Sequence, residues 1–510
     1  MAGHLLILLA PVTLFTVHLL VCITRSIRSP LKTVSGPFLA RFSDVWYFWT
    51  VRKGHFEVAN RELHEKYGPV VRYGPNRYSI NDPNASKIIY GLGTQFPKSP
   101  WYTAWAAPGQ WNIFSDQSTK HHAQTRRLFQ ATYSMTAMVN YEPFVDECNS
   151  LFTQRLMEMA HAAVPINMGH WFQCYAFDVI GMVTYGERLG FLDRGDDIGG
   201  VMGALEDHMH YATLVGIFPS FHRHLYALKN YWAGAKGAGR AYVLSFTRDR
   251  IREHQTTPKA VPEVPEGATA KGSFLTKFLA KHAADPDTFT SYHVLTGCSA
   301  NMVAGSDTTA ISLSAILYHL LKTPQCLQKL RDEIENCTAQ GNLSEYPTFQ
   351  ESQQMPYLQA IIKEALRMHP ATGLPLERVV PEGGSTICGR YFPAGTVVGI
   401  NTWIEHRDPR IFGKDADIFR PERWLEEDSE RISVMNRHWM PFGLGSRSCI
   451  GRHVSMLEIS KLVPRLIRDF NFSLESAAGE NKDWQTKGFW FVKPRDFIVR
   501  AKVRKYARSG

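Results

Sequence analysis

The chain has 510 residues, of which 44% are hydrophobic, 12% aromatic and 20% charged. This balance is typical of a globular enzyme and excludes a disordered or fibrous protein. The net charge of +10 is spread along the chain without a basic patch rich in aromatic residues, so nucleic acid is not an expected partner. An acidic membrane surface and an acidic protein are better candidates.

The first element in the chain is an apolar run at residues 4–23, which contains no Asp, Glu, Lys or Arg. At about 1.5 Å per residue, a helix of this length matches a hydrocarbon core of roughly 30 Å. Arg25, Arg28 and Lys32 follow directly, so the positive-inside rule predicts a single span of the endoplasmic reticulum membrane with a lumenal N-terminus and a cytosolic body. A cleaved signal peptide is the alternative, but the charge lies on the wrong side of the run and an A-x-A site is missing.

Residues 24–40 are predicted to form a basic, proline-containing hinge between this anchor and the body, since Pro30 and Pro37 fall within them. No repeat and no long Ser/Gly linker divides the rest of the chain. We therefore expect residues 41–510 to form one large domain, and we expect a monomer. The eight cysteines have no regular spacing, which favours reduced thiols.

The body is predicted to be mainly α with small β-sheets (α+β). A hairpin is indicated where residues 70–73 and 77–80, rich in β-branched and aromatic types, flank a Gly-Pro-Asn turn. A second strand-rich segment spans about 376–400, and the sequence between the two segments is mainly helical in pattern. Pro258 to Gly267 is rich in Pro and Glu and is expected to be an exposed loop.

Within a long apolar helix, from about 292 to 321, Gly305, Asp307 and Thr308 stand close together. A carboxylate and a hydroxyl are disfavoured in such a helix, because they compete with backbone hydrogen bonds or stay unsatisfied. They therefore indicate either chemistry or a helix kink with a Ser/Thr bond to the preceding turn.

The most informative run is Phe442-Gly-Leu-Gly-Ser-Arg-Ser-Cys449-Ile-Gly451. Gly445 and Gly451 would let the backbone approach a flat cofactor and point N–H groups at a sulfur, while Arg447 suits a carboxylate. Phe442 would pack beneath the ring, and a helix starting near Val454 would face a thiolate with its N-terminus. We predict that Cys449 is the thiolate ligand of a haem iron. A buried cysteine in a glycine-rich turn is the alternative.

This run resembles the haem loop of the cytochrome P450 family, whose pattern Phe-x-x-Gly-x-Arg-x-Cys-x-Gly is present at every specified position. Glu364-Ala-Leu-Arg367 is similar to the family's Glu-x-x-Arg helix. The segment 419–424 is similar to the one whose arginine, here Arg423, closes the ion-pair network that fixes the fold. The order and spacing of the set carry the resemblance, because a lone Glu-x-x-Arg pair is common on helices.

Two further segments extend the resemblance. His122 and Arg126 align with the pair that holds a haem propionate in the family; a metal site at the two adjacent histidines lacks a third ligand at a useful spacing. Residues 304–309 match the family's oxygen-binding helix. There the resemblance implies that Gly305 leaves a gap for dioxygen, Thr308 hydrogen-bonds the bound oxygen and Asp307 helps to bring protons from water.

The resemblance implies that residues 41–510 form a haem-thiolate monooxygenase domain with the cytochrome P450 fold and haem b as cofactor. Electrons would come from NADPH through a separate NADPH-cytochrome P450 reductase. The sequence from Leu376 to Gly384 is similar to the fungal branch of pisatin demethylase-like enzymes, which commonly serves secondary metabolism. A haem-thiolate isomerase or dehydratase and a non-catalytic haem-binding protein are the alternatives, but neither needs the Asp307–Thr308 pair.

The substrate pocket is expected to draw on residues 101–111, Asn301 and Met302, residues 372–376 and residues 488–490, by their positions relative to these motifs, and Trp105, Met302, Leu374 and Phe489 are singled out among them. Because such a pocket is mostly apolar, it favours a sizeable lipophilic small molecule with few hydrogen-bond anchors. Residues 208–235 are predicted to form a lid that touches the membrane.

Overall fold

The computed structural model describes residue 24 and residues 28–234, 237–256, 272–475 and 484–504. The predicted anchor at residues 4–23 and the predicted loop at 258–267 lie outside these ranges. Across the described ranges, no helix has both the length and the apolar character that a bilayer crossing requires. The anchor therefore stays a prediction.

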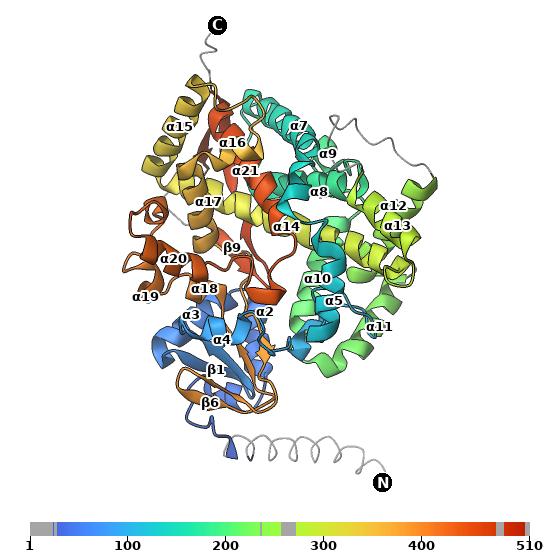
Figure 1. The fold of residues 1–510 in the computed structure, drawn as a ribbon, viewed down its shortest axis with the longest axis vertical. Helices are drawn as coiled ribbons and strands as arrows, with labels where there is room; N and C mark the ends of the chain where they lie inside the picture. Colours follow the sequence, from blue (N-terminus) through green and yellow to red (C-terminus); the bar gives the residue numbers. More distant parts are fainter. Residues whose placement is uncertain (1–23, 25–27, 235–236, 257–271, 476–483, 505–510) are drawn as a thin grey trace, which may run out of the picture.

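The largest sheet lies at the end of the fold where the described chain begins, and it joins distant parts of the sequence (Figure 1). It contains β1 (Val70–Gly74), β2 (Arg77–Ile80), β7 (Val397–Gly399) and β4 (Arg378–Val379) in that order. The β1–β2 pair is the predicted antiparallel hairpin. Around it lie η1 (Phe38–Arg41), α2 (Val45–Lys53), α3 (Phe56–Tyr67), α4 (Ala85–Tyr90) and the hairpin of β5 (Ser385–Ile387) and β6 (Arg390–Phe392).

Helices form most of the chain between the two strand-rich segments, as predicted. The longest, α14 (Ser291–Lys322), has 32 residues and ends before Pro324, whose ring cannot continue a helix. It packs along α8 (Met168–Tyr185). The other elements here are η2 (Pro100–Trp105), α5 (Thr119–Gln130), α6 (Met135–Val139), α7 (Glu142–His161), β3 (Ile166–Asn167), α9 (Phe191–Arg194), α10 (Val201–Val215), η3 (Pro219–Phe221), α11 (His222–Ala233), α12 (Arg240–Thr256), α13 (Phe274–Ala284), α15 (Pro324–Ala339), α16 (Phe349–Gln353) and α17 (Pro356–Met368).

The C-terminal part ends in α21 (Arg452–Asp469), which directly follows the Cys449 loop and whose side chains are mostly buried. Short elements precede it: α18 (Thr402–Glu405), α19 (Pro409–Phe412), η5 (Pro421–Trp424), α20 (Ser429–His438) and η6 (Gly445–Arg447). After it, β11 (Ile498–Val503) lies between β3 and β8 (Phe470–Leu474) and pairs with both, and β9 (Gln485–Gly488) pairs with β10 (Val492–Arg495).

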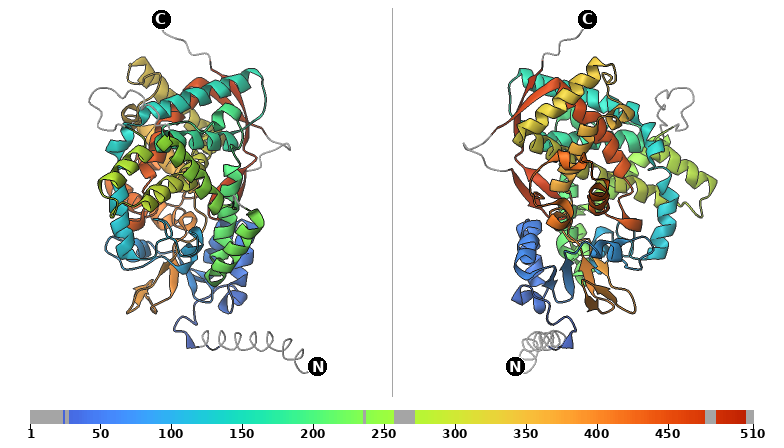
Figure 2. Two further views of the ribbon diagram at one scale, coloured as in Figure 1. Left: turned by 90° about the vertical axis from the view of Figure 1, so that its right-hand side faces the viewer. Right: turned by 60° about the vertical axis from the view of Figure 1, so that its left-hand side comes forward.

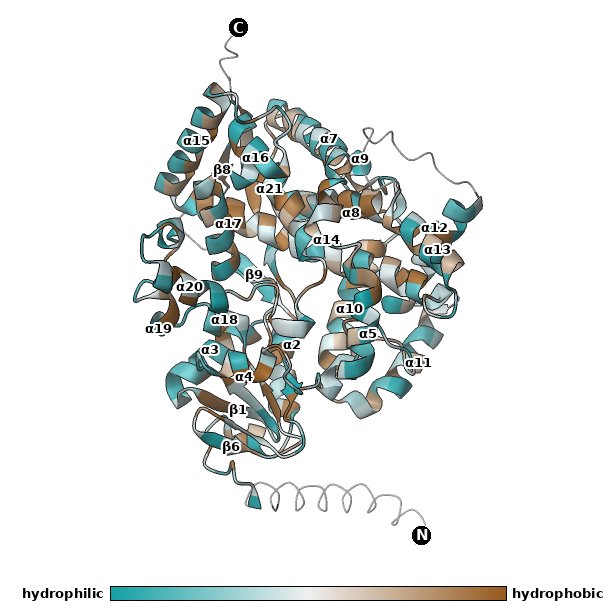
Figure 3. Cartoon of the chain, viewed as in Figure 1, coloured by the Kyte–Doolittle hydropathy of each residue, from teal (hydrophilic) through white to brown (hydrophobic). Residues whose placement is uncertain are grey.

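The main hydrophobic core lies where α14 meets α8, α17 and α21. Figure 3 shows hydrophobic segments on α8 and α14 inside, whereas outer helices such as α15 carry many hydrophilic residues. Figure 2 shows the same central helices from two further sides, covered by neighbours in both views. The fold is mainly α with small β-sheets, as the sequence predicts. Its central feature is that α14 crosses the interior beside the Cys449 loop.

Candidate active site

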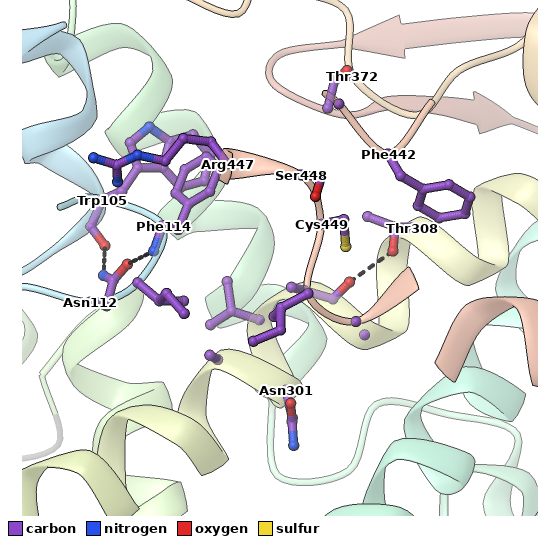
Figure 4. A pocket seen from close by; sticks show the side chains of 18 of the residues that line it. Trp105, Asn112, Phe114, Asn301, Thr308, Thr372, Phe442, Arg447, Ser448 and Cys449 are labelled. Carbon is purple, nitrogen blue, oxygen red and sulfur yellow. Dashed lines mark hydrogen bonds between the residues drawn. The ribbon is translucent and has the colours of Figure 1, made fainter. Parts of the chain in front are cut away.

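A cavity of about 310 Å³ lies between α14, the Cys449 loop and helices α5, α10 and α12, a volume in the range of small-molecule sites. Figure 4 shows Cys449 on its loop and Thr308 on α14 at this cavity. The predicted site residues that line it are Trp105, His122, Arg126, Gly305, Thr308, Phe442, Arg447, Cys449 and Gly451. The fold therefore brings together residues that are more than 340 positions apart in sequence.

The thiol of Cys449 is accessible from this cavity. Its backbone N–H donates to the carbonyl of Phe442 at 2.8 Å, and Arg126 donates to the carbonyl of Ser448 at 2.7 Å, so both neighbours fix the loop. Burial raises the pKa of the Cys449 thiol, while the backbone N–H of Gly451 and the charge of Arg126 act in the opposite direction. The loop thus offers a sulfur whose anionic form is supported by nearby donors.

Gly445 and Gly451, the two loop glycines singled out from the sequence, have different surroundings. Gly445 has φ +63°, and a Cβ there would lie 1.8 Å from the carbonyl oxygen of Tyr90, at the end of α4. Gly445 does not line the cavity, so the structure gives it a packing role instead of the predicted approach to a cofactor. Gly451 does line the cavity, and a Cβ there would contact no described atom within 4 Å.

Positive charge gathers on one side of the cavity. Lys98, Arg126, Arg378 and Arg447, here called the cavity cations, all line it, and in the described chain none of them pairs with a carboxylate. They donate instead to backbone carbonyls, as Lys98 does to Phe114 at 2.5 Å and Arg447 to Asp116 at 2.6 Å. The sequence predicts two of the four; Lys98 and Arg378 were missed.

The cavity cations act on the groups beside them. Burial and then the charge of Arg378 lower the pKa of Arg447 to about 10. Burial, Arg378 and Arg447 lower the pKa of Lys98 well below its ordinary value. Burial, followed by Arg447 and Lys98, lowers the pKa of His122 to about 3. This side of the cavity is therefore built to receive negative charge.

The predicted ion network is present behind the cavity and is fully buried. Arg367 donates to Glu364 through Nε at 2.9 Å and Nη2 at 2.8 Å, and Arg423 donates to Glu364 through Nε at 2.9 Å. Trp424 adds a bond from its indole N–H at 2.9 Å. Burial alone would raise the pKa of Glu364, but hydrogen bonds from Arg367 and the charges of Arg367 and Arg423 bring it below its ordinary value.

Comparison with known proteins gives a consistent result. The family model for cytochrome P450 matches residues 39–499. A pisatin demethylase from Fusarium vanettenii is 38% identical over 494 residues, which cover 96% of this chain and 92% of that protein. A cytochrome P450 monooxygenase from Aspergillus terreus is 36% identical, covering 91% and 94%, and cytochrome P450 monooxygenase gsfF from Penicillium aethiopicum is 34% identical, covering 93% and 94%.

The chain belongs to the cytochrome P450 family. It is accordingly an oxidoreductase that incorporates oxygen from O2, and its cofactor is haem b with an axial cysteine thiolate. The relatives give no support to the isomerase and non-catalytic alternatives.

The cavity of this P450 fits haem on three counts. A thiol supported by N–H donors is accessible from it, and cations without carboxylate partners stand beside it to receive two propionates. Gly451 lines it without a side chain, at a point where a Cβ would meet no described atom within 4 Å. Lys98 and Arg378 belong to the cations that face the propionates because both line this side of the cavity.

The α14 residues of the P450 do not all face the cavity. Thr308 does, and its hydroxyl donates to the carbonyl of Ala304 at 2.8 Å, the bond to the preceding turn foreseen as the alternative. Gly305 lines the cavity as well, but a Cβ there would lie 2.9 Å from Ile180 of α8, so close helix packing is a reason for this glycine that the sequence does not show.

Asp307 is buried and does not line the cavity. Gln173 donates to its carboxylate at 2.6 Å, and the ammonium of Lys493 lies 2.7 Å from it as an ion pair. Since the side chain of Lys493 is 29% exposed, Asp307 lies between Thr308 and a residue that reaches solvent.

Of the four pocket residues singled out from the sequence, Trp105 lines the cavity of the P450, whereas Met302, Leu374 and Phe489 do not. Met302 belongs to the main core and Leu374 to the aromatic cluster around Trp101, while Phe489 packs on His210 with ring centroids 3.9 Å apart. Other members of the same predicted segments do line the cavity, namely Asn301, Thr372, Leu376 and Trp490, together with the adjacent Val303 and Phe491.

Proposed function

We propose that Cys449 ligates the haem iron and that the enzyme inserts oxygen into a lipophilic small molecule of fungal secondary metabolism. The observation that carries the proposal is that the Cys449 thiol, Thr308 of α14 and the cavity cations all line one cavity. The names of the relatives, pisatin demethylase and fungal P450 monooxygenases, support this substrate class.

In this proposal the residues divide the work. Arg126, Arg447, Lys98 and Arg378 hold the propionates, with His122 beside them, and the N–H groups at the start of α21 lower the basicity of the Cys449 thiolate. Bound haem supplies the iron at which O2 is reduced with two electrons and two protons, so that one oxygen atom enters the substrate and the other leaves as water.

The proposed path for protons runs along α14. Thr308 offers a hydroxyl at the cavity, and its bond to Ala304 can exchange for one to a bound molecule by rotation about χ1. Asp307, held by Gln173 and Lys493, would take protons from the solvent side. Gly305 would leave space beside Thr308 in this arrangement.

We further propose that the enzyme is a single-pass protein of the endoplasmic reticulum, with anchor 4–23, hinge 24–40 and catalytic domain 41–510. Apolar side chains support a membrane-facing surface: Phe38, Leu39, Trp49, Phe221, Leu228, Tyr231 and Trp232 are all exposed. The elements that carry them meet, because Phe48 and Phe218 have ring centroids 5.9 Å apart and α10 packs on α2. Trp, Tyr and Phe are favoured at membrane interfaces.

Electrons are proposed to come from NADPH-cytochrome P450 reductase, bound to a monomer of this enzyme. Exposed cations surround the outer side of the haem loop: Lys120 and Arg127 on α5, and Arg452 at the start of α21. Since Arg126 ties α5 to the loop through Ser448, these charges lie on elements joined to the ligand loop. An acidic partner surface would be steered to them.

The test is expression of the full chain with an NADPH-cytochrome P450 reductase in a metabolite-producing host, followed by comparison of extracts. We expect a product one oxygen heavier than its precursor, or the demethylated product of such an oxidation, that requires O2 and the reductase and takes its oxygen from 18O2. Turnover that continues without O2 and reductase would contradict monooxygenation.

A further inference from the structure

Arg240, the first residue of α12, is a second kind of cation in the cavity. It lines the cavity and is only 6% exposed. In the described chain it has no ion pair and no hydrogen bond, and its Nε is enclosed without a partner. A guanidinium stays charged at neutral pH, and a buried charge is costly unless it is paired. The fold therefore keeps at the cavity a charge that it does not neutralise.

No carboxylate of the described chain compensates this charge. Burial lowers the pKa of Arg240, and only the hydroxyl groups of Tyr292 and Tyr226 act in the opposite direction. Asp207, on the neighbouring α10, is engaged by Lys229 at 2.6 Å. An anion for Arg240 must then come from outside the described chain.

Arg240 is separate from the cavity cations assigned to haem. Those four act on one another, as Arg378, Arg447 and Arg126 do on Lys98, whereas the charge of Arg240 adds to burial in lowering the pKa of His208 on α10. It is on α12, while the four come from α5, the haem loop, β4 and the segment before η2. Two carboxylates of one haem therefore do not account for it.

Two other polar side chains without partners stand near Arg240. His208 of α10 and Trp105 of η2 both line the cavity, with ring centroids 5.6 Å apart, and His208 Nε2 and Trp105 Nε1 have no hydrogen-bond partner in the described chain. Helix α10 packs on both α12 and η2, which brings the three residues to one part of the cavity. An indole N–H can only donate, so this part is rich in donors.

We infer that Arg240, with Trp105 and His208, binds a carboxylate of the substrate, which is therefore an amphipathic organic acid. This rests on the proposed function and narrows its substrate class, since the sequence predicts a lipophilic molecule with few anchors. The rest of the lining, including Phe114, Val303 and Phe491, suits the apolar part of the molecule. With its acidic group held by α12, α10 and η2, the molecule is oxidised in its apolar part.

The inference is tested by equilibrium dialysis of the full-length, haem-loaded enzyme without reductase. The probes are biphenyl-4-carboxylate and dodecanoate, each compared with its primary amide, which has nearly the same shape without the charge. We expect each acid to bind roughly 10- to 100-fold more tightly than its amide, the range for charge-assisted hydrogen bonds. Arg240→Gln should remove this preference by weakening the acids alone, and Arg240→Lys should retain part of it.

The matched control is Arg248→Gln, because Arg248 is on the same helix but exposed, and its loss should leave the preference unchanged. Since the charge of Arg240 is unpaired, Arg240→Gln should unfold at the same temperature as the parent or higher. If the parent bound no acid, or bound acids and amides alike, the inference would be overturned. A misfolded Arg240→Gln protein would overturn it too, by giving the guanidinium a structural role.

The two proposals can fail separately. Acid-selective binding without any NADPH-dependent oxygenation would contradict the proposed monooxygenation and keep the inference about Arg240. Oxygenation of neutral compounds by a protein that shows no preference for acids would contradict the inference alone.

Discussion

Two groups of arginines lie in the interior of this P450, and they differ in how their charge is met. Arg367 and Arg423 share the carboxylate of Glu364, Arg423 also pairs with Asp415 at 3.1 Å, and both arginines donate to backbone carbonyls as well. Arg378 and Arg447, at the cavity, have only carbonyl partners. The first group is neutralised within the protein, whereas the second keeps positive charge directed at a ligand.

This difference teaches how to separate residues of the fold from residues of the site. A buried cation of the fold is met by a carboxylate, as in the Glu364 network, or by backbone carbonyls away from the cavity, as Arg72 is met by Leu31 and Pro75. A cation without an anion that also lines the cavity indicates that a ligand supplies one. The cavity cations and Arg240 both meet this criterion, at two different parts of the same cavity.

The largest effect is expected from Cys449→Ala. Removal of the sulfur should abolish oxygenation and the optical band of CO-bound, thiolate-ligated haem, while circular dichroism shows an unchanged helix content because the Glu364 network is untouched. Cys298→Ala, at a buried cysteine of α14 that lies away from the loop, serves as the control. An unaltered CO spectrum in Cys449→Ala would exclude this residue as the ligand.

Glu364→Ala should have the next largest effect, on stability. It leaves the fully buried Arg367 without a carboxylate and Arg423 with Asp415 alone, and breaking a buried pair in this way typically costs about 3–5 kcal/mol. We expect the loss in both the apo and the haem-loaded chain, measured by denaturant unfolding. Glu335→Ala, at the exposed ion pair with Arg504, should cost far less. Equal losses of unfolding free energy in the two variants would contradict the expected difference between a buried and an exposed ion pair.

Arg378→Gln should affect the haem-loaded form alone. Loss of one propionate partner should weaken haem retention by about 1–3 kcal/mol, measured by the rate of haem transfer to an acceptor protein. The apo chain should be equally stable or more stable, because one of several repelling cations has gone. Destabilisation of the apo chain would show that Arg378 stabilises the fold, as Arg367 and Arg423 do, and is not reserved for haem.

Thr308→Ala tests whether a polar group at the cavity acts chemically. We expect haem to be retained, with electrons from NADPH diverted to peroxide and the yield of product per NADPH lowered several-fold. Thr309→Ala is the matched control, since the Thr309 hydroxyl is buried against Ser455 at 2.9 Å. Normal coupling in Thr308→Ala would contradict the proposed proton path.

Arg127→Glu should give the smallest effect, a salt-dependent fall in the rate of reductase-supported turnover. Exposed charges at an interface mainly change association rates, so the defect should disappear as ionic strength rises. Turnover supported by a chemical oxygen donor should be unchanged. A defect that is independent of salt would indicate a role within the protein.

The sequence predicts the residues whose spacing is fixed by one loop or one helix. Cys449, Arg447, Glu364 and Arg367 are recognised this way, and the structure brings each to the expected neighbourhood. Lys98 could not be found, because no short pattern surrounds it. Arg378 stands in a segment that the sequence singles out for its family resemblance, but nothing local shows that it faces the cavity.

The position of Met302 outside the cavity lining has a physical reason in helical phase. Adjacent helical residues are about 100° apart around the axis, so Asn301 can face the cavity while Met302 faces the core. The same uncertainty affects Asp307, which points to Lys493 while Thr308 points to the cavity. Local sequence fixes the element but leaves its rotation to the packing of α8 and β10.

Gly445 and Gly451 of the haem loop should differ in the substitutions that a library of variants tolerates. Replacement of Gly445 should be rejected in any screen for folded protein, because Tyr90 already occupies the space. Replacement of Gly451 by alanine should pass such a screen and be lost only when haem loading is selected. The substitutions accepted at Gly445 and at Gly451 would then separate a requirement of the protein fold from a requirement of the bound haem.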